Sequence, residues 1–320
     1  MEGQRIQRWD NVKGLLITLV VTGHFLMYVK NNGGAQIILL FIYSFHMPAF
    51  VLISGMMSKR AVKQKDLSKI TYFLIIFLLI KALLALAKLI AGYENIGWPI
   101  YIIDDVSWYA FALAVFYPLT MILSKLNKKV VLTVSVVAAC AAGYADSIST
   151  MLSASRLFVF FPFFFMGYCL DRDRVLAAAK ERNLRTAALL VLACCAVLTV
   201  LFADKMWPLF GLLQGKYPYT DLLNPEMICW GGLFRLGWYV LAFLLTASIV
   251  ICCPDKKPVL DVGKNTLSIY VYHNPLIILC MRTPIGGVLY QSIFFMLAAG
   301  IILALVIGVV VVPSVGILIP

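Results

Sequence analysis

The sequence predicts an all-α protein, a polytopic membrane bundle of about ten transmembrane helices with both termini in the cytoplasm. Three observations support this fold class: the composition, the number of long apolar stretches, and the placement of basic residues between them. Of the 320 residues, 62% are hydrophobic and only 13% are charged, and the mean hydropathy is +0.93. A soluble domain does not tolerate that balance, so we expect a membrane protein.

Ten apolar stretches are long enough to hold a spanning helix. We expect these helices near residues 13–30, 36–57, 70–91, 106–123, 130–146, 155–170, 186–203, 228–253, 266–282 and 289–312. The polar start of the chain runs into the first stretch without a small-residue cleavage site, so we expect the first helix to be retained. The chain shows no internal repeat, and residues 1–320 are expected to form one integral-membrane domain.

Lysines and arginines gather in alternate connections between the apolar stretches, beginning with the N-terminal segment. The other connections hold few of the 27 cationic residues and several carboxylates. Because cytoplasmic loops carry the excess of Lys and Arg, this alternation predicts ten spans with both ends inside. The net charge of +12 is therefore a topology signal. No basic patch outgrows its short loop, so no nucleic-acid partner is expected.

All eight cysteines fall within or at the edge of apolar stretches, and no two form a Cys-x-x-Cys pair. We interpret them as small buried hydrophobic residues rather than as disulfides or metal ligands, and we predict no metal site. They are Cys140, Cys169, Cys194, Cys195, Cys229, Cys252, Cys253 and Cys280.

The first apolar stretch carries the strongest candidate for chemistry, His24. It lies eleven positions after Lys13, which places both on nearly the same helix face, about 16 Å apart along the axis. Asp10 and Lys13 have the i,i+3 spacing of an ion pair. Ionisable groups inside a bilayer usually line a functional cavity, and a neutral imidazole there can serve as a general base. The alternative is a core histidine hydrogen-bonded to a neighbouring helix.

The second apolar stretch contains His46, Pro48 and the pair Ser54-Gly55. His24 and His46 are expected at a comparable mid-membrane depth, joined by a short turn, so that their imidazoles face one another. Pro48 frees a backbone carbonyl, which suits a helix that borders a polar cavity. Alternatively, His46 satisfies the carbonyl that the proline frees. Ser54-Gly55 permits close helix packing.

Three more charged residues lie within predicted spans and need partners. Arg156 and Arg235 are expected near the outer face, where a planar guanidinium suits a carboxylate, a phosphate or sugar hydroxyls. Structural ion pairs with Asp146 or Glu226 are the alternative. Lys81 is expected near mid-membrane, where its side chain needs a polar partner because it cannot easily reach the surface.

Several motifs, in order, resemble one family. They are Arg5–Gly14 with Val20–His24, Phe45–Pro48 with Ser54-Gly55, Trp108-Tyr109, Arg156–Tyr168, and Gly263–His273. Together with the ten-span layout they resemble the acyltransferase-3 integral-membrane acyltransferases, and within them the fucose 4-O-acetylase-like branch. The resemblance covers essentially the whole chain.

The resemblance implies transfer of an acyl group, usually acetyl, to a hydroxyl of a surface glycan or lipid-linked sugar at the plasma or inner membrane. Acetyl-CoA would be a co-substrate, and no permanently bound cofactor is implied. The family's basic-x10-His motif falls on Lys13 and His24, with His24 as the implied catalytic residue. The family's Arg-x-x-Ser-Arg motif is reduced here to Ser58-Lys59-Arg60, which leaves its donor contacts in question.

Acyl transfer to an alcohol requires a base and an oxyanion donor. We expect His24 to take the acceptor proton, and His46, rather than Arg235 or a backbone amide, to stabilise the oxyanion. His273 either contacts the donor or caps the kink at Pro275. The remaining expected contacts are those to the donor, from Lys13, Lys59, Arg60, Tyr270, Tyr272 and His273, and those to the acceptor, from Trp108, Tyr109, Arg156 and Arg235.

Two other function classes remain open. A proton-coupled transporter or flippase would also need buried His, Lys and Arg groups and Pro-broken helices. Against it, the sequence lacks paired halves with matching interruptions, and carboxylates are absent from the helix interiors. A non-catalytic membrane sensor would keep the same polar groups for mutual pairing alone. The long outer segment 204–227 either caps a cavity or rests its aromatic residues at headgroup level.

Overall fold

A computed structural model describes residues 7–94, 96, 100–148, 150–256 and 262–310. Within these ranges the chain is helical, and the pairing of extended residues is limited to an isolated bridge between Ile102 and Met151. The all-α prediction is confirmed. Arg5, Lys257 and the end of the predicted helix at 289–312 lie outside the described residues.

The helices follow one another along the chain with short connections. They are α1 (Gln7–Leu26), η1 (Met27–Val29), α2 (Gly33–Met57), α3 (Lys59–Gln64), α4 (Ser68–Ile90), α5 (Trp108–Leu123), α6 (Lys128–Ala142), α7 (Ala154–Cys169), α8 (Arg172–Ala178), α9 (Arg182–Met206), η2 (Trp207–Leu209), α10 (Phe210–Gln214), α11 (Tyr219–Leu222), η3 (Pro225–Trp230), α12 (Gly231–Cys252), η4 (Val262–Lys264), α13 (Thr266–Met281), α14 (Pro284–Leu289) and α15 (Ile293–Val310).

An α-helix occupies each of the ten places where the sequence predicts one, and α15 forms most of the last predicted stretch, which begins at the final residue of α14. Within the described part of the chain, five helical stretches are long and apolar enough to cross a membrane. A sixth is reached if α7 and α8, bent by 87°, form one span. The helices α5, α13 and α15 are apolar but shorter. Ten spans and cytoplasmic termini therefore stay predictions.

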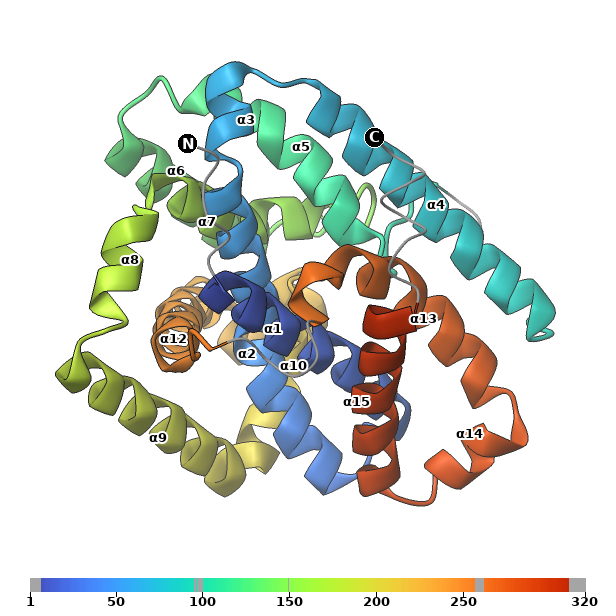
Figure 1. Ribbon diagram of the computed structural model, residues 1–320. Coiled ribbons are helices and arrows are strands. Elements are labelled where there is room, and N and C mark those ends of the chain that lie inside the picture. Colours follow the sequence, from blue (N-terminus) through green and yellow to red (C-terminus); the bar gives the residue numbers. More distant parts are fainter. Residues whose placement is uncertain (1–6, 95, 97–99, 149, 257–261, 311–320) are drawn as a thin grey trace.

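α1 and α2 lie in the middle of the bundle (Figure 1). α4 and α5 run along one side, and α8 and α9 along the opposite side. α2 packs against α7, and α1 packs against α2, α13 and α15. The two N-terminal helices are thus surrounded by segments from the rest of the chain, which brings distant residues to His24.

α2 and α7 approach each other through two glycines. A Cβ added at Gly55 would lie 1.9 Å from the Phe164 carbonyl oxygen, and one added at Gly167 would lie 1.9 Å from the Leu52 carbonyl oxygen. No side chain fits at either position, so the two backbones are in direct contact. The close packing predicted at Gly55 is confirmed, and the residue that it meets is part of the aromatic run of α7.

The backbone carbonyl that Pro48 frees does not accept a hydrogen bond from His46. That carbonyl belongs to Ser44, and the indole Nε1 of Trp238 donates to it over 3.0 Å. His46 instead donates from Nδ1 to the Ile42 carbonyl at 2.8 Å. The histidine-cap alternative for Pro48 is therefore wrong, because α12 supplies the missing donor. α2 remains continuous through the proline.

A bidentate ion pair joins the start of α1 to the segment after α12. Arg8 Nε donates to Oδ1 of Asp255 and Arg8 Nη2 donates to Oδ2, each over 2.7 Å. Arg8 Nη1 also donates to the carbonyls of Val250 and Ile251. The hydrogen bond from Arg8 holds the pKa of the Asp255 carboxyl below its ordinary value. A charged first turn is thereby anchored to the end of another helix.

The cysteines carry free thiols, but the prediction that they are buried holds only in part. Cys253 is buried, whereas Cys194 and Cys229 are exposed and the others are half-buried. The exposed thiols belong to α9 and η3. α9 lies at the periphery of the bundle, where many of its apolar side chains also face outward.

Replacing Gly167 with Ala should lower the free energy of unfolding by about 1–3 kcal/mol, because the new methyl group overpacks the α2–α7 contact. Gly237→Ala is the matched control, since a Cβ there meets no heavy atom within 4 Å. Thermal midpoints in the same detergent compare the two variants. Equal midpoints for both would contradict the close backbone contact.

Acid should weaken the Arg8–Asp255 tie. The pKa of Asp255 is lower in the folded protein than its ordinary value. The ion pair therefore contributes fully to the free energy of unfolding above the ordinary aspartate pKa, and this contribution is lost as the pH falls through the pKa of the folded state. Asp255→Asn should therefore melt below the wild type at neutral pH, and the gap should close on acidification. A gap that stays constant down to the acid limit would contradict this assignment.

Candidate functional site

An apolar and a polar cavity meet at His24. The apolar cavity has a volume of about 260 Å³ and the polar cavity about 270 Å³. Their shared lining residues are His24, Met47, Val106 and Trp108. A single imidazole therefore borders two chemically different spaces, which is the main feature of the site.

The apolar cavity extends from His24 toward the end of the bundle where α1 begins. Ile17 and Val20 continue the His24 stripe of α1 along its wall. Its far end is formed by Tyr72 near the start of α4 and Thr266 at the start of α13. This end corresponds to the predicted inner side. Most of the remaining wall consists of apolar side chains from α2, α4, α5 and α13.

The polar cavity extends toward the opposite end of the bundle. It is lined by Asp104 and Asp105 from the segment before α5, and by Gln214 and Lys216 from the segment after α9. Arg156 at the start of α7 also lines it. The segment 204–227 thus borders a cavity, as one of its two interpretations predicts. Its aromatic Tyr219 is fully buried rather than placed at a surface.

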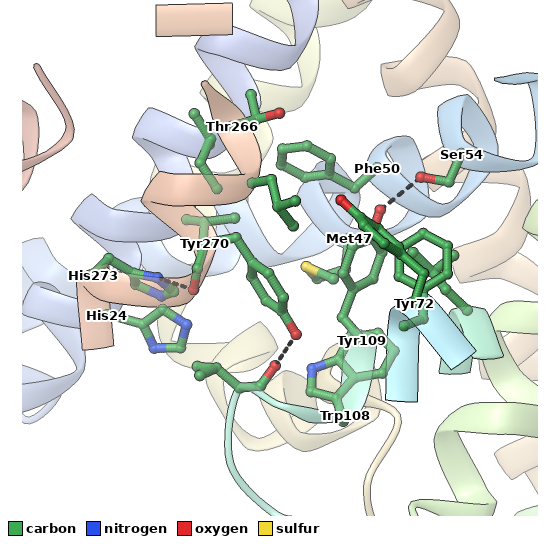
Figure 2. A pocket seen from close by; sticks show the side chains of 16 residues that line it. His24, Met47, Phe50, Ser54, Tyr72, Trp108, Tyr109, Thr266, Tyr270 and His273 are labelled. Atoms are coloured by element: carbon green, nitrogen blue, oxygen red, sulfur yellow. Dashed lines mark hydrogen bonds between the residues drawn. The ribbon is translucent and has the colours of Figure 1, made fainter. Parts of the chain in front are cut away.

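His24 lies in the last turn of α1. α1 begins at Gln7, before the start near residue 13 that the sequence predicted, so His24 lies closer to the end of its helix than expected. The described residues offer it no hydrogen bond, so the alternative of a core histidine tied to a neighbouring helix is not what the structure shows. Its ring instead lies beside that of His273, with 5.2 Å between centroids (Figure 2).

His273 is fully buried and has one fixed nitrogen. Its Nδ1 lies 3.0 Å from the Ile269 carbonyl oxygen and 2.9 Å from that of Tyr270. A carbonyl only accepts, so Nδ1 carries the proton. Neither oxygen is the Val271 carbonyl that Pro275 frees. The kink-capping interpretation is therefore wrong for this residue, and its Nε2 has no hydrogen-bond partner.

His46 lines the polar cavity together with His24. The ring that it contacts is Tyr43, at 4.7 Å between centroids, so the two predicted catalytic histidines share a cavity without stacking on each other. The bond from Nδ1 to Ile42 leaves the Nε2 of a neutral His46 as an acceptor. A neutral His46 therefore cannot donate to an oxyanion from Nε2.

Tyr270 fixes the start of α5 and with it the aromatic wall between the cavities. Its hydroxyl donates to the Val106 carbonyl at 2.6 Å and accepts from the Ala110 amide at 3.1 Å. Free amides in the first turn of a helix need such a partner, and Ser107 provides no side-chain cap. Trp108 and Tyr109 begin the helix, and the Tyr109 hydroxyl lies 2.6 Å from Ser54 Oγ (Figure 2).

Arg156 is buried without an ion-pair partner among the described residues. Its guanidinium makes long contacts of 3.4 Å to the carbonyls of Gln214 and Ile103. It also lies 5.0 Å from the centroid of the Trp108 ring. The suggested pair with Asp146 does not form, because Asp146 accepts from Thr220 instead. Arg156 is therefore available to a polar molecule in the cavity.

The polar partner predicted for Lys81 is Asp105, at 2.8 Å, with the Ile102 carbonyl at 2.9 Å. Burial by itself raises the pKa of Asp105, but the hydrogen bonds from Lys81 and Ser107 outweigh it, and the pKa lies below its ordinary value. The segment before α5 thus reaches back to the middle of α4. Asp104 forms its own pair, with Lys216 at 2.5 Å.

Several predicted contact residues lie away from both cavities. Lys13 pairs with Asp10 at 2.9 Å, as the i,i+3 spacing predicts, but it lines neither cavity. Lys59 donates to the Leu170 carbonyl, and Arg60 is exposed. Tyr272 is half-buried on α13 and also lines neither cavity.

Arg235 has a different environment from the one that the sequence suggested. It is 1% exposed and donates from Nη1 to the Leu212 carbonyl at 2.6 Å. Its guanidinium lies 5.8 Å from the ring centroid of Tyr219 and 5.6 Å from that of Trp238. It lines neither cavity and holds the segment after α9 against α12.

The polar cavity is also lined by four residues for which the sequence predicted no site role: Tyr43, Asp104, Asp105 and Lys216. Their only sequence signal is an acidic pair before one apolar stretch and a lone lysine within a long outer segment. These features served to assign topology. Their role depends on two loops meeting over the end of α1.

A family model that describes an acyltransferase domain, acyltransferase-3, matches residues 6–315 of the chain. The chain belongs to the acyltransferase-3 family. Membership of this family favours the enzyme hypothesis over a transporter or a sensor. The resemblance seen in the order of the motifs is confirmed at the level of the family.

Two curated relatives of this acyltransferase-3 chain are nodulation proteins. The NolL protein of Sinorhizobium fredii is 28% identical over 232 residues, covering 67% of this chain and 60% of the relative. The NolL protein of Mesorhizobium japonicum is 42% identical over 65 residues, or 19% of this chain and 17% of the relative. The chain therefore spans less than two thirds of the length of the relatives that it matches. No solved structure matches it.

Removing the Tyr270 hydroxyl should destabilise the start of α5. Tyr270→Phe leaves the buried Ala110 amide without its acceptor, which costs about 1–3 kcal/mol. Tyr272→Phe, on the same helix but without that bond, is the matched control. Thermal midpoints of the two purified variants test this, and an unchanged midpoint for Tyr270→Phe would contradict the capping role.

Proposed function

We propose that this protein is an O-acetyltransferase that moves an acetyl group from acetyl-CoA to a hydroxyl of a cell-surface or lipid-linked carbohydrate. The observation that carries the proposal is the position of His24 between an apolar and a polar cavity. Membership of the acyltransferase-3 family supports acyl transfer. The order of the motifs supports the fucose 4-O-acetylase-like branch and a place in the plasma or inner membrane.

The apolar cavity suits the acyl-donor arm. A pantetheine chain carries no charge, and a wall of Ile17, Val20 and Phe50 offers it an apolar path toward His24. Tyr270 and His273 line this path, so both predicted contacts to the acyl donor are retained in the proposal. The phosphates of CoA would stay at the mouth.

Basic residues near the end of the bundle where α1 begins would bind those phosphates. Lys13 belongs to the second turn of α1 and Lys59 to the first turn of α3, and Arg60 follows on an exposed surface. Cationic donors of this kind bind phosphate through charge-assisted hydrogen bonds. Tyr272 is the remaining predicted donor contact and would act near the same end of α13.

The polar cavity suits a sugar. Trp108 offers an aromatic face, and Arg156 offers donors to hydroxyl groups. Tyr109 stands next to Trp108 on α5 and borders the apolar side. Arg235 would contribute indirectly, by holding the segment that carries Gln214 and Lys216. The acceptor would thus reach His24 from the side opposite to the donor.

In the reaction, His24 takes the proton of the acceptor hydroxyl while its oxygen attacks the thioester carbonyl carbon. The carbon–sulfur bond then breaks, the ester forms, and the CoA thiolate receives the proton from His24. The oxyanion needs a hydrogen-bond donor near His24. Arg156 provides one, whereas His46 can do so from Nε2 only as an imidazolium, because Ile42 already holds its Nδ1 proton.

His24→Ala should abolish acetylation while the protein accumulates to its normal level. Mass spectrometry of surface glycans measures the acetyl increment, first in a strain lacking the protein and then in that strain carrying each variant. Lys30→Ala is the control, because this exposed lysine follows the same helix and lines neither cavity. Retained acetylation in a well-expressed His24→Ala strain would refute the proposal.

A further inference from the structure

All three histidines of the chain line these cavities. The proposed reaction uses His24 as the base and assigns no chemical role to His273. Yet His273 is 0% exposed, and its Nε2 makes no hydrogen bond with the described residues. A buried polar atom without a partner costs about 1–3 kcal/mol, so its retention needs an explanation.

The proton on Nδ1 of His273 determines whether Nε2 donates or accepts a hydrogen bond. Two carbonyls, from Ile269 and Tyr270, hold the proton on Nδ1. Nε2 of the neutral ring is then a hydrogen-bond acceptor with a free lone pair. Because both carbonyls belong to the preceding turn of α13, the helix itself fixes the ring. The tautomer does not depend on any bound molecule.

The nearest ring is that of His24. The ring centroids are 5.2 Å apart and the ring planes are tilted by 41°. The two rings are not hydrogen-bonded to each other in the structure, but two imidazoles joined nitrogen to nitrogen have about this centroid separation, so a rotation of the His24 side chain would bring the nitrogens together. His24 makes no hydrogen bond with the described residues. The two rings therefore complement each other, since one has an unused acceptor and the other an unused donor (Figure 2).

We propose that His273 is a positioning residue, whose Nε2 accepts a hydrogen bond from one ring nitrogen of His24. This bond fixes the tautomer and orientation of His24, so that the lone pair of its second nitrogen faces the acceptor hydroxyl. The inference rests on the proposed function and adds to it the group that orients the base. A base oriented by a third group recurs among enzymes that activate a hydroxyl.

The proton balance of the step is unchanged. The acceptor hydroxyl gives its proton to the free nitrogen of His24, and His24 becomes an imidazolium that still donates to His273. No proton passes to His273. When the carbon–sulfur bond breaks, the same proton moves from His24 to the thiolate. His273 thus stabilises the charged form of the base, which a carboxylate does in other sites.

A donor-binding role for His273 makes a different prediction. If the ring served only as a wall of the apolar cavity, its loss would weaken acetyl-CoA binding and raise KM, with turnover preserved. A positioning role lowers kcat, because the interaction with His24 strengthens as the base becomes charged. The two roles are therefore separated by how the effect divides between kcat and KM.

The test uses the full-length protein in membrane vesicles of the source cells, which contain the native acceptor. Release of CoA thiol is followed as acetyl-CoA is varied. His273→Leu should lower kcat about a hundredfold, the scale of losing a positioned base, with little change in KM. His273→Gln places a carbonyl oxygen near the position of Nε2 and should recover part of the lost turnover.

Leu267→Ala is the matched control, since Leu267 lines the same cavity on the same helix. It should change KM and leave turnover nearly intact. Size-exclusion profiles and thermal midpoints establish that each variant is folded. If His273→Leu does not fold, His273→Gln decides. A lowered kcat at constant KM supports the positioning role, and full turnover with a raised KM overturns it.

His24→Ala in the same vesicles separates this inference from the proposed function. If His24→Ala retains acetyl transfer, His24 is not the base and both proposals fall. If His24→Ala is inactive while a folded His273→Leu turns over at the wild-type rate, only the positioning role is wrong. Equal losses in kcat for His273→Leu and His273→Gln would also contradict it, because the restored acceptor would then have no effect.

Discussion

The structure depends on one constraint: polar groups inside an apolar bundle must find their partners within the protein. The carbonyl freed by Pro48 receives the Trp238 indole, and Lys81 meets Asp105. The first turn of α5 receives the Tyr270 hydroxyl. Each of these bonds joins segments far apart in the chain, so the need for partners also determines which helices are neighbours.

Against this background, the groups around His24 differ from the rest. His24 and Nε2 of His273 make no hydrogen bond with the described residues, and Arg156 has only long contacts to carbonyls. All three residues line a cavity. Arg235 also has unpartnered nitrogens, but they lie against aromatic rings rather than in a cavity. Polar groups kept available beside a cavity are what a bound substrate would use.

The two cavities provide separate approaches to His24 from opposite ends of the bundle. Apolar walls lie on the side of the first turns of α1, α4 and α13, and charged residues lie on the side of the long connections. Trp108 and Met47 belong to both, so little more than one layer of side chains separates them. An uncharged thioester arm and a polyhydroxylated acceptor can thus approach one imidazole from opposite ends. Glycine contacts such as that of Gly167 with Leu52 hold the surrounding helices close.

The sequence by itself determined the helices, because apolar length and the placement of Pro, Gly and charges act locally. It also determined the Asp10–Lys13 pair and the stripe of Ile17, Val20 and His24, which need only helical periodicity. The family followed from the order of its motifs.

Only the tertiary structure decided that His24 meets His273 rather than His46, and that loops carrying Asp104 and Lys216 close the polar cavity. Periodicity defines which residues share a face of one helix, but not which helix that face meets or how far each helix is shifted along its axis. Those choices follow from packing and hydrogen bonding across the whole bundle. They combine residues from both ends of the chain, and no local pattern records them.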